Sequence, residues 1–343
     1  MDSACSPLPG ALPPLSKPRF TSTHILRWLA AQQNWDKIHF DQQFCTDVAK
    51  LEAPVINGAL KQHWIVQFLS QGLPGSWPWR VNYQFVGPDF VGQKLRIQGQ
   101  VKDTQDFEGR EYVNVDVEIF NIDRNQVTTR GNAVVVLGGH DRPVLDVVGM
   151  RMPEDMHLNP GVSALDSAVP AQMNSHLGQQ FDARESLYPI DLSRLRLFAD
   201  AVMDLAPVHF DTHVGAVSPW GQVVAPPLYP LHGIEGRPGA LPLSESLRAQ
   251  GREGVNEVGR DLASKFGLDP AGGMNAGNQV EIHSLARVGE TIHAASKLVG
   301  IKRRVGKRGG EMYFFETLNR YIESTGRPLV TERQTVVLRI VGS

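Results

Sequence analysis

The sequence is poor in cysteine and has no long apolar run. Only two cysteines occur, Cys5 and Cys45, which excludes a disulfide framework and a zinc site of four thiolates. No run of about 18 apolar residues is present, so no transmembrane helix is expected. The N-terminus also lacks the basic-then-apolar pattern of a secretory signal. We therefore expect a cytoplasmic protein that does not associate with a membrane.

Neither sign of charge dominates the chain. There are 34 Lys and Arg residues against 36 Asp and Glu residues, giving a net charge of −2. This balance lacks the broad positive field of a nucleic-acid-binding protein, so no nucleic-acid partner is expected. With 41% hydrophobic and 20% charged residues, the composition is typical of a globular protein with a core. The length of 343 residues predicts about two domains.

An internal repeat divides the chain. Residues 34–41 resemble residues 204–211, and the two histidines of these segments, His39 and His209, are 170 positions apart. Upstream of each segment, apolar residues recur at helical spacing, and Thr23 and Ser193 are plausible N-caps of the two helices. Each half is therefore predicted to contain a short helix, with a histidine five residues after its end.

The same order of elements follows in both halves. An apolar helix is expected over residues 55–69, and its counterpart begins at the pair Pro226-Pro227, which suits the first turn of a helix. Alternating apolar residues then predict strands over 95–101 and 113–119 in the first half. In the second half the expected strands are 291–301, 312–322 and 329–341.

The spacing of two glycines predicts an insertion. Gly92 and Gly289 precede the first strand of each set, and they are 197 positions apart instead of 170. The second half should therefore carry extra residues near 233–277. The expected organisation is a flexible Pro-rich arm (1–19), a first unit (20–137), an irregular linker (138–177) and a second unit (178–343).

The second half contains a spaced Asp, Pro and His. Asp204 is followed five residues later by His209, and Pro207 stands two residues before the histidine. This resembles the hydratase motif of the MaoC-like dehydratases, which are (R)-specific enoyl-thioester hydratases with a hotdog fold. Residues 223–228 resemble the segment of that family that leads into the central helix, and 287–291 resemble its strand-opening turn. The resemblance implies an α+β fold, a tandem (double) hotdog in which each antiparallel sheet wraps a central helix.

The resemblance also implies a reaction and its residues. Asp204 and His209 would form a dyad that activates water for the reversible hydration of a trans-2-enoyl-CoA, which would make the protein a hydro-lyase. The backbone N–H groups of Gly58 and Ala59 would supply the oxyanion donors. The CoA thioester would be the substrate and no cofactor is implied. A homodimer of double hotdogs would be compatible with the family.

The first half departs from the motif because Asn34 stands where the family usually has Asp. An amide accepts no proton at neutral pH, so Asn34 cannot be the base. Asn34 and His39 are therefore expected to form either a second site, in which Asn34 orients a water, or a vestigial one. The order of the halves is also unusual, since the half with the Pro pair usually comes first in two-domain members.

Two other functions remain open at this stage. A hotdog fold also hosts thioesterases, and a non-catalytic acyl-CoA-binding subunit of a hydratase complex would have the same frame. The basic run over 302–308 could bind the phosphates of coenzyme A, or it could be a solvated hairpin.

Two further features admit alternative interpretations. His209 and His213 have the spacing of a helical metal pair, but no Glu lies between them and no third ligand is evident, so no metal is expected. Trp77 and Trp79 could line an acyl tunnel or simply pack a rigid loop.

Overall fold

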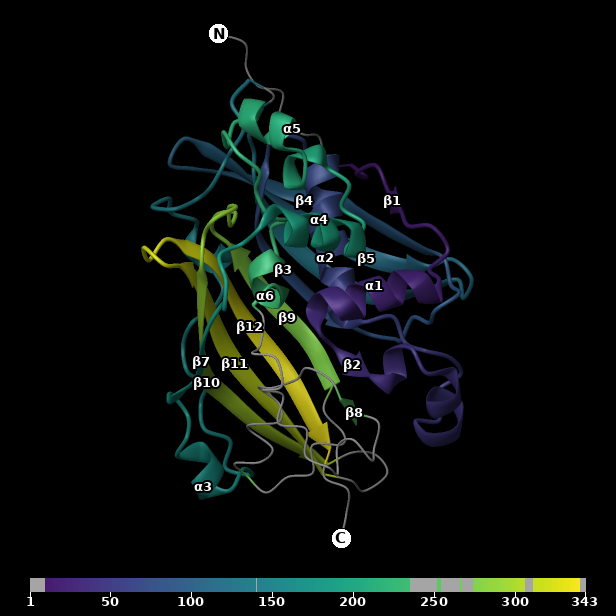
Figure 1. The fold of residues 1–343 in the computed structure, drawn as a ribbon. Helices are drawn as coiled ribbons and strands as arrows, with labels where there is room; N and C mark the ends of the chain where they lie inside the picture. Colours follow the sequence, from purple (N-terminus) through teal and green to yellow (C-terminus); the bar gives the residue numbers. More distant parts are fainter. Residues whose placement is uncertain are drawn as a thin grey trace.

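The computed structural model describes residues 10–139, 141–234, 252–253, 266, 274–305 and 311–339. Within these residues ten strands form one antiparallel sheet, in the order β1-β4-β5-β6-β3-β9-β12-β11-β10-β7 (Figure 1). Their bounds are β1 (Leu15–Ser16), β3 (Trp77–Phe85), β4 (Leu95–Phe107), β5 (Arg110–Asn121), β6 (Gln126–Val136), β7 (Gln180–Glu185), β9 (Met274–Ile282), β10 (Ile292–Val305), β11 (Glu311–Glu323) and β12 (Pro328–Arg339). Two short strands, β2 (Trp35–Asp36) and β8 (Arg252–Glu253), pair separately.

The strand order repeats in mirror image about the middle of the sheet. The first unit contributes β4-β5-β6-β3 and the second contributes β10-β11-β12-β9, so β3 and β9 become neighbours. Val81 of β3 lies opposite Val280 of β9, and the two sheets continue into each other there. The antiparallel α+β architecture expected from the sequence is confirmed, and the repeated order gives the two halves equivalent frameworks.

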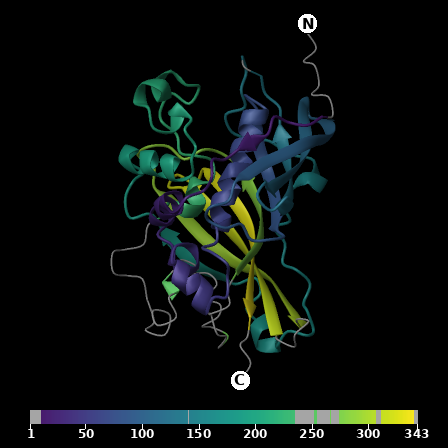
Figure 2. The same ribbon diagram turned by 90° about the vertical axis from the view of Figure 1, so that its right-hand side faces the viewer.

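One long helix, α2 (Gly58–Gly72), lies against the sheet of the first unit. Its residues from 60 to 69 are all buried, which is why the segment is apolar around most of its circumference. Figure 2 shows α2 in the middle of the molecule, with strands curving past it. The helix begins three residues later than expected because Asn57 is its N-cap and accepts a hydrogen bond from the Ala59 N–H.

The second unit has only a short described helix at the equivalent place. This is α6 (Tyr229–His232), four residues long with a proline in its first turn. Residues 235–251 follow directly and lie outside the described residues, as does most of the insertion expected near 233–277. The structure therefore shows the central helix of the first unit, and one turn in the second.

Two short helices, one from each unit, pack against each other: α1 (Ser22–Gln32) and α4 (Leu192–Ala201). The expected N-caps are wrong, since the helices are capped two residues earlier, by Thr21 and Asp191. The Asp191 side chain accepts a hydrogen bond from the N–H of Arg194, which only the residue before the first turn can do. The two caps are again 170 positions apart, so the repeat itself holds.

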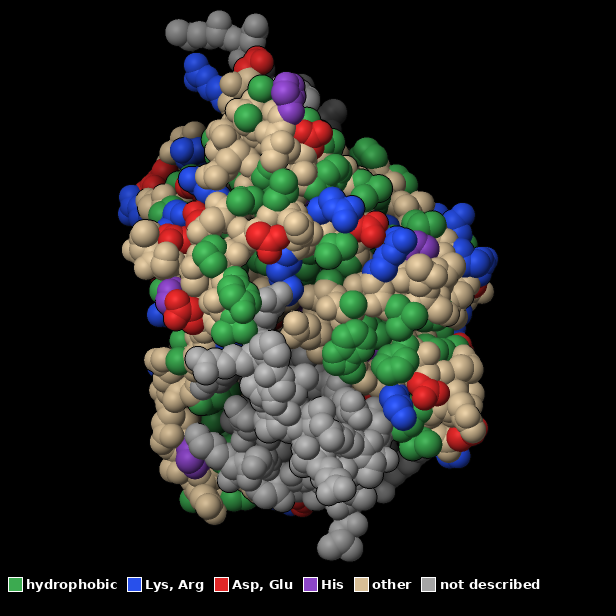
Figure 3. Space-filling view, viewed as in Figure 1, with side chains coloured by type: hydrophobic (Ala, Val, Ile, Leu, Met, Phe, Trp, Pro, Cys, Tyr) green, Lys and Arg blue, Asp and Glu red, His purple; other side chains and the backbone are tan. Residues whose placement is uncertain are grey.

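The remaining helical segments are short. In the loops of the two units they are η1 (Lys37–His39), η2 (Phe44–Val48), η4 (Pro207–His209) and α5 (Thr212–Val217). Between the units they are η3 (Glu154–Met156) and α3 (Ala171–Asn174). No helix in the described part of the chain is long and apolar enough to cross a membrane. On the face seen in Figure 3, basic and acidic side chains are interspersed.

The N-terminal segment differs from the expected flexible arm over 1–19. Residues 1–9 lie outside the described residues, but Ala11 bridges to Gln100 and the strand Leu15–Ser16 pairs with β4. Lys17, which follows, is buried. The correction has a simple cause: β4 would otherwise end the sheet with unpaired backbone groups, and this segment pairs with them.

Candidate active site

Asp204 and His209 are positioned by the turn that follows α4. The Asp204 N–H donates to the carbonyl of Ala199 at 2.9 Å, which places the aspartate directly after the helix. The chain then enters η4, whose first residue is Pro207, and its fixed φ suits the start of a helical turn. His209 is the last residue of that turn, so the five-residue spacing brings the two side chains together.

The geometry of the pair fixes the histidine tautomer. His209 Nδ1 lies 2.9 Å from the carbonyl oxygen of Val224, which can only accept, so Nδ1 carries a proton. His209 Nε2 lies 3.6 Å from Asp204 Oδ2. This distance is too long for a direct hydrogen bond, and both atoms are left free to bind a common third group. Asp204 and His209 are 7% and 6% exposed, respectively.

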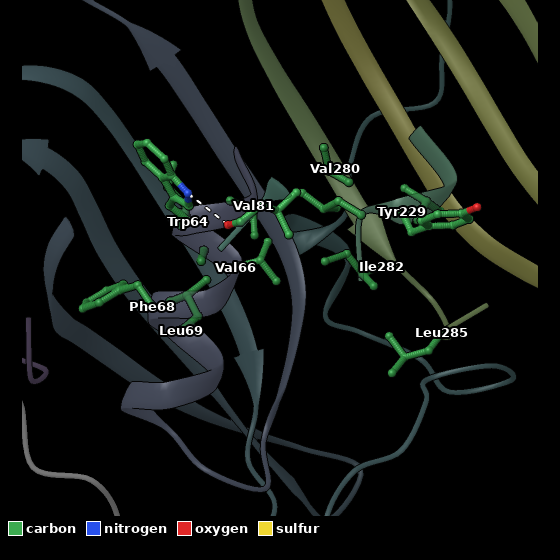
Figure 4. Packing of buried hydrophobic residues seen from close by; sticks show 14 of the residues in the cluster. Trp64, Val66, Phe68, Leu69, Val81, Tyr229, Val280, Ile282 and Leu285 are labelled. Carbon is green, nitrogen blue, oxygen red and sulfur yellow. Dashed lines mark hydrogen bonds between the residues drawn. The ribbon is translucent and has the colours of Figure 1, made fainter. Parts of the chain in front are cut away.

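Both residues line a cavity of about 290 Å³ that is built by the two units together. Most of its wall is apolar, as a site for an acyl chain requires. Val66 of α2 faces it from the first unit, and Ile282 and Leu285 face it from the second (Figure 4). Its lining residues are His63, Val66, Gln67, Ser70, Gln71, Gly75, Ser76, Trp77, Pro78, Pro143, Val144, Asp204, Ala206, Val208, His209, Trp220, Pro227, Leu228, Ile282 and Leu285.

The expectation that Gly58 and Ala59 supply the oxyanion donors is not met by this geometry. The cavity meets the middle and the end of α2, and neither residue is in its wall. The Ala59 N–H already donates to the Asn57 side chain at 2.9 Å. A Cβ on Gly58 would stand 2.8 Å from the Phe85 ring, so that ring closes the start of the helix. The donors must therefore come from elsewhere.

The pair in the first half, Asn34 and His39, is held differently. His39 Nδ1 lies 2.8 Å from the carbonyl of Val55, the counterpart of the contact that His209 makes. His39 Nε2, however, lies 3.1 Å from Nδ2 of Asn57. Both ring nitrogens are therefore engaged, and burial lowers the histidine's pKa. The Asn34 side chain accepts a hydrogen bond from the Asp36 N–H, and no hydrogen bond joins it to the imidazole in the described structure. This arrangement favours the vestigial alternative.

Lys17 was not singled out by the sequence, yet it lies beside the dyad. Its Nζ donates to Gln67 Oε1 at 2.5 Å and lies 3.5 Å from the carbonyl of Met203, the residue before Asp204. Burial lowers the pKa of Lys17 to about 8, and the charge of Asp204 acts in the opposite direction. Because it comes from a Pro-rich segment with no periodicity, no local signal identified it.

His63 was also missed by the sequence analysis. It lines the cavity from the middle of α2, where a lone histidine inside an apolar helix resembles an ordinary core residue. Trp77 lines the cavity as well, with its indole N–H donated to the carbonyl of Ile282 at 2.7 Å. Trp79 packs against Tyr112 instead, so only one of the two tryptophans faces the cavity.

The other candidate features lie apart from the dyad's chemistry. The described part of the basic run is ion-paired: Lys302 with Glu316, Arg303 with Glu311, and Arg304 with Asp166. Residues 306–310 lie outside the described part. In the part of the chain that the structure describes, no group of three or more His, Cys, Asp or Glu side chains could hold a metal ion.

Comparison with known proteins gives a family-model match over the second unit and a fold. Residues 175–332, which include the dyad, match the family model of the FAS1-like dehydratase domain region. A comparison with curated protein sequences gives no match.

Solved structures match over nearly the whole chain. A MaoC domain protein dehydratase from Chloroflexus aurantiacus J-10-fl superposes with a TM-score of 0.63 at 12% identity, over 97% of this chain and 95% of that one. A Mycobacterium tuberculosis protein described as a double hotdog gives a TM-score of 0.57 at 11% identity, over 96% and 94%. The Drosophila melanogaster peroxisomal multifunctional enzyme type 2 gives 0.52 at 14%, over 95% of this chain and 48% of that one.

At such low identity these structures show a shared fold and not a shared activity. The fold is nevertheless that of double hotdog proteins across both units. The dehydratase model over residues 175–332 and this fold both agree with the MaoC-like dehydratase family that the sequence motif indicated.

Proposed function

We propose that the protein adds water reversibly across the double bond of a trans-2-enoyl-CoA, with Asp204 and His209 as the catalytic residues. The proposal is carried by one observation: Asp204 and His209 are buried in the wall of an apolar cavity, with His209 Nε2 3.6 Å from Asp204 Oδ2 and no direct hydrogen bond between them. The dehydratase family of the second unit supports the reaction class. The CoA ester is the part of the proposal that rests on the family resemblance alone.

The two side chains are suited to hold one water. Nε2 of neutral His209 and Oδ2 of Asp204 are both acceptors, so a water between them can donate one hydrogen to each. Its oxygen lone pair then points away from both, toward the cavity. As the oxygen bonds to the β-carbon of the enoyl group, Asp204 takes one water proton, and a proton passes from the dyad to the α-carbon. Atoms and charge balance without any cofactor.

The cavity explains how the acyl group would be held beside this water. Its wall is largely aliphatic and aromatic, so burial of the acyl chain supplies binding energy and excludes bulk water. Ser70 and Gln71, at the end of α2, are exposed and mark the side open to solvent. The thioester's coenzyme portion would leave on that side.

The direct test measures the hydration of crotonyl-CoA, which is monitored as the loss of absorbance of its enoyl thioester. Asp204→Asn and His209→Gln should each lower kcat by about 10²–10⁴-fold, since each removes a positioned proton acceptor. Asn34→Asp serves as the matched control, because it alters the equivalent position of the other unit. Full activity in both dyad variants would refute the proposal.

The two alternatives give different products. A thioesterase would release free thiol from butyryl-CoA, whereas a hydratase leaves the thioester intact. A non-catalytic subunit would be stabilised against heat by butyryl-CoA and would turn over nothing. No buried Ser, Thr or Cys side chain lines the cavity in the described structure, which disfavours a route through a seryl or cysteinyl acyl-enzyme.

A further inference from the structure

The proposed reaction places negative charge on the thioester oxygen, and the helix start beside the dyad offers few donors for it. The N–H of Ala225 is donated to the carbonyl of Ala286 at 2.8 Å. Pro226 and Pro227 have no N–H at all. At residues 225–227 the backbone amides that could stabilise an oxyanion are therefore used or missing.

The part of the same cavity wall that comes from the first unit carries a polar atom without a partner. His63, from α2 of the first unit, is 2% exposed and lines the cavity together with Asp204 and His209. Its Nε2 is buried and has no hydrogen-bond partner in the described structure. A buried, unpaired ring nitrogen costs stability, so its retention at a cavity wall points to a ligand group that completes it.

The surroundings of His63 keep it uncharged. Its ring packs edge-on against Trp28 and Phe198 and lies near His232. Burial holds the pKa of His63 well below its usual range, and the nearby His232 and Lys17 lower it further. A neutral imidazole has one N–H to donate, and it can stabilise an enolate oxygen without giving up a proton to it.

The other buried polar side chains of the cavity are already committed. Gln67 accepts from Lys17 and donates to the carbonyl of Val202 at 3.0 Å. The indoles of Trp77 and Trp220 donate to the carbonyls of Ile282 and Leu145. Apart from the dyad, His63 is the buried side chain of this wall with an uncommitted donor in the described structure.

We propose that His63 donates a hydrogen bond to the thioester carbonyl oxygen and stabilises the enolate that forms there. The inference rests on the proposed function and extends it, because it makes the first unit a contributor to the chemistry of the second. The donor and the dyad then line one cavity but come from different units.

The test compares His63→Phe with His232→Phe in the full-length chain. Both remove a buried imidazole from the same aromatic cluster, but His232 is not in the cavity wall. Loss of one oxyanion donor should lower kcat for crotonyl-CoA by about 10²–10³-fold with little change in KM. His232→Phe should stay within about threefold of wild type. His63→Gln, which keeps an N–H donor, should recover part of the loss.

A second measurement does not depend on turnover. The infrared carbonyl band of bound butyryl-CoA, labelled with ¹³C at the thioester carbon, should lie at lower frequency in wild type and His232→Phe than in His63→Phe. The melting temperature of His63→Phe should not fall, since an unpaired buried nitrogen is removed.

The outcomes separate the two proposals. If wild type hydrates crotonyl-CoA and His63→Phe does so equally well with an unshifted band, the role of His63 is refuted and the function stands. If wild type binds butyryl-CoA with the His63-dependent shift but hydrates nothing, the carbonyl contact stands and hydration is refuted. If it neither binds nor hydrates, both fail.

Discussion

The two units share one framework, but only one of them keeps an open pair of reactive side chains. In each, a histidine at the end of a short 3₁₀ turn bonds through Nδ1 to the carbonyl of a valine, Val55 or Val224. The residue two positions after that valine determines whether Nε2 of the histidine has a hydrogen-bond partner. In the first unit it is Asn57, which contacts His39. In the second it is Pro226, which has no polar side chain.

The turn of the first unit differs from that of the second in its surroundings as well as in its acidic residue. Replacement of Asp by Asn34 removes the proton acceptor, Asn57 occupies the imidazole, and Phe85 packs on Gly58 where the helix begins. These changes are mutually consistent. The side chains of Asn34 and His39 have hydrogen-bond partners within the protein, whereas Nε2 of His209 and Oδ2 of Asp204 are left for a ligand.

The largest expected effect concerns the transfer of the aspartate from one unit to the other. Asp204→Asn should lose about 10²–10⁴-fold in kcat, and adding Asn34→Asp should restore none of it, because His39 remains bound to Asn57. Initial rates with crotonyl-CoA at equal enzyme concentrations measure this. Recovery of activity in the double variant would show that the first unit is a competent site.

The next effect is on stability, and it concerns Lys17, whose counterpart 170 positions on is Leu187. The pKa of Lys17 is lowered from 10.5 to about 8 in the folded protein. Between these values the unfolded chain holds a proton that the folded chain has released, so this lysine makes the protein more stable as the pH rises from 8 to 10.5. The gain should reach about 3 kcal/mol at most.

Lys17→Met should remove that gain. Urea unfolding of the wild type and the variant at pH 8 and pH 10.5 isolates the difference, since all other titrating groups are common to both proteins. A variant whose stability follows the same pH dependence as wild type would mean that the lysine is not held in this environment.

A smaller effect is expected when the second unit is given the residue of the first. Pro226→Asn would place an amide two positions after Val224, where it could donate to His209 Nε2 as Asn57 does to His39. The amide would compete with the substrate water for His209 Nε2, and one neutral hydrogen bond of this kind should lower kcat about tenfold. Pro227→Ala, next to it, is the control. Unchanged kcat in Pro226→Asn would show that the residue after the valine does not decide which imidazole is free.

The smallest effect concerns the basic run of β10. Arg304 is largely exposed and pairs with Asp166 at 3.7 Å. Arg304→Gln should change the free energy of unfolding by less than about 0.5 kcal/mol and leave KM for crotonyl-CoA unaltered. A several-fold rise in KM would revive the interpretation that this run binds the phosphates of coenzyme A.

The sequence was informative wherever a local pattern was strong. Alternating residues located β4, β5, β10, β11 and β12, and both marker glycines, Gly92 and Gly289, have positive φ values of 96° and 88°. The strands β1, β3, β6, β7 and β9 were not predicted. Residues 79–85 of β3 do alternate between apolar and polar, but the strand starts Trp-Pro-Trp, and a proline argues against a central strand.

For the site, the motif placed Asp204 next to His209, but it could not reveal the residues that the first unit contributes to the cavity. His63 and Gln67 come from a helix more than a hundred residues away, and their spacing is that of any buried helix. The expected donors Gly58 and Ala59 are at the start of that helix, whereas the cavity meets its middle and its end. Contacts between distant segments are set by the packing of the two units, and no local pattern encodes them.

Pairing of β3 with β9 joins the two units into one sheet. The cavity residues from α2 and the dyad therefore belong to one polypeptide. Two separate chains would have to meet before such a pocket existed, and they would part again when diluted. In this chain the two units are covalently linked, so the formation of the pocket does not depend on protein concentration. In a homodimer every substitution appears in both subunits. In a tandem repeat, each unit can acquire substitutions that the other lacks.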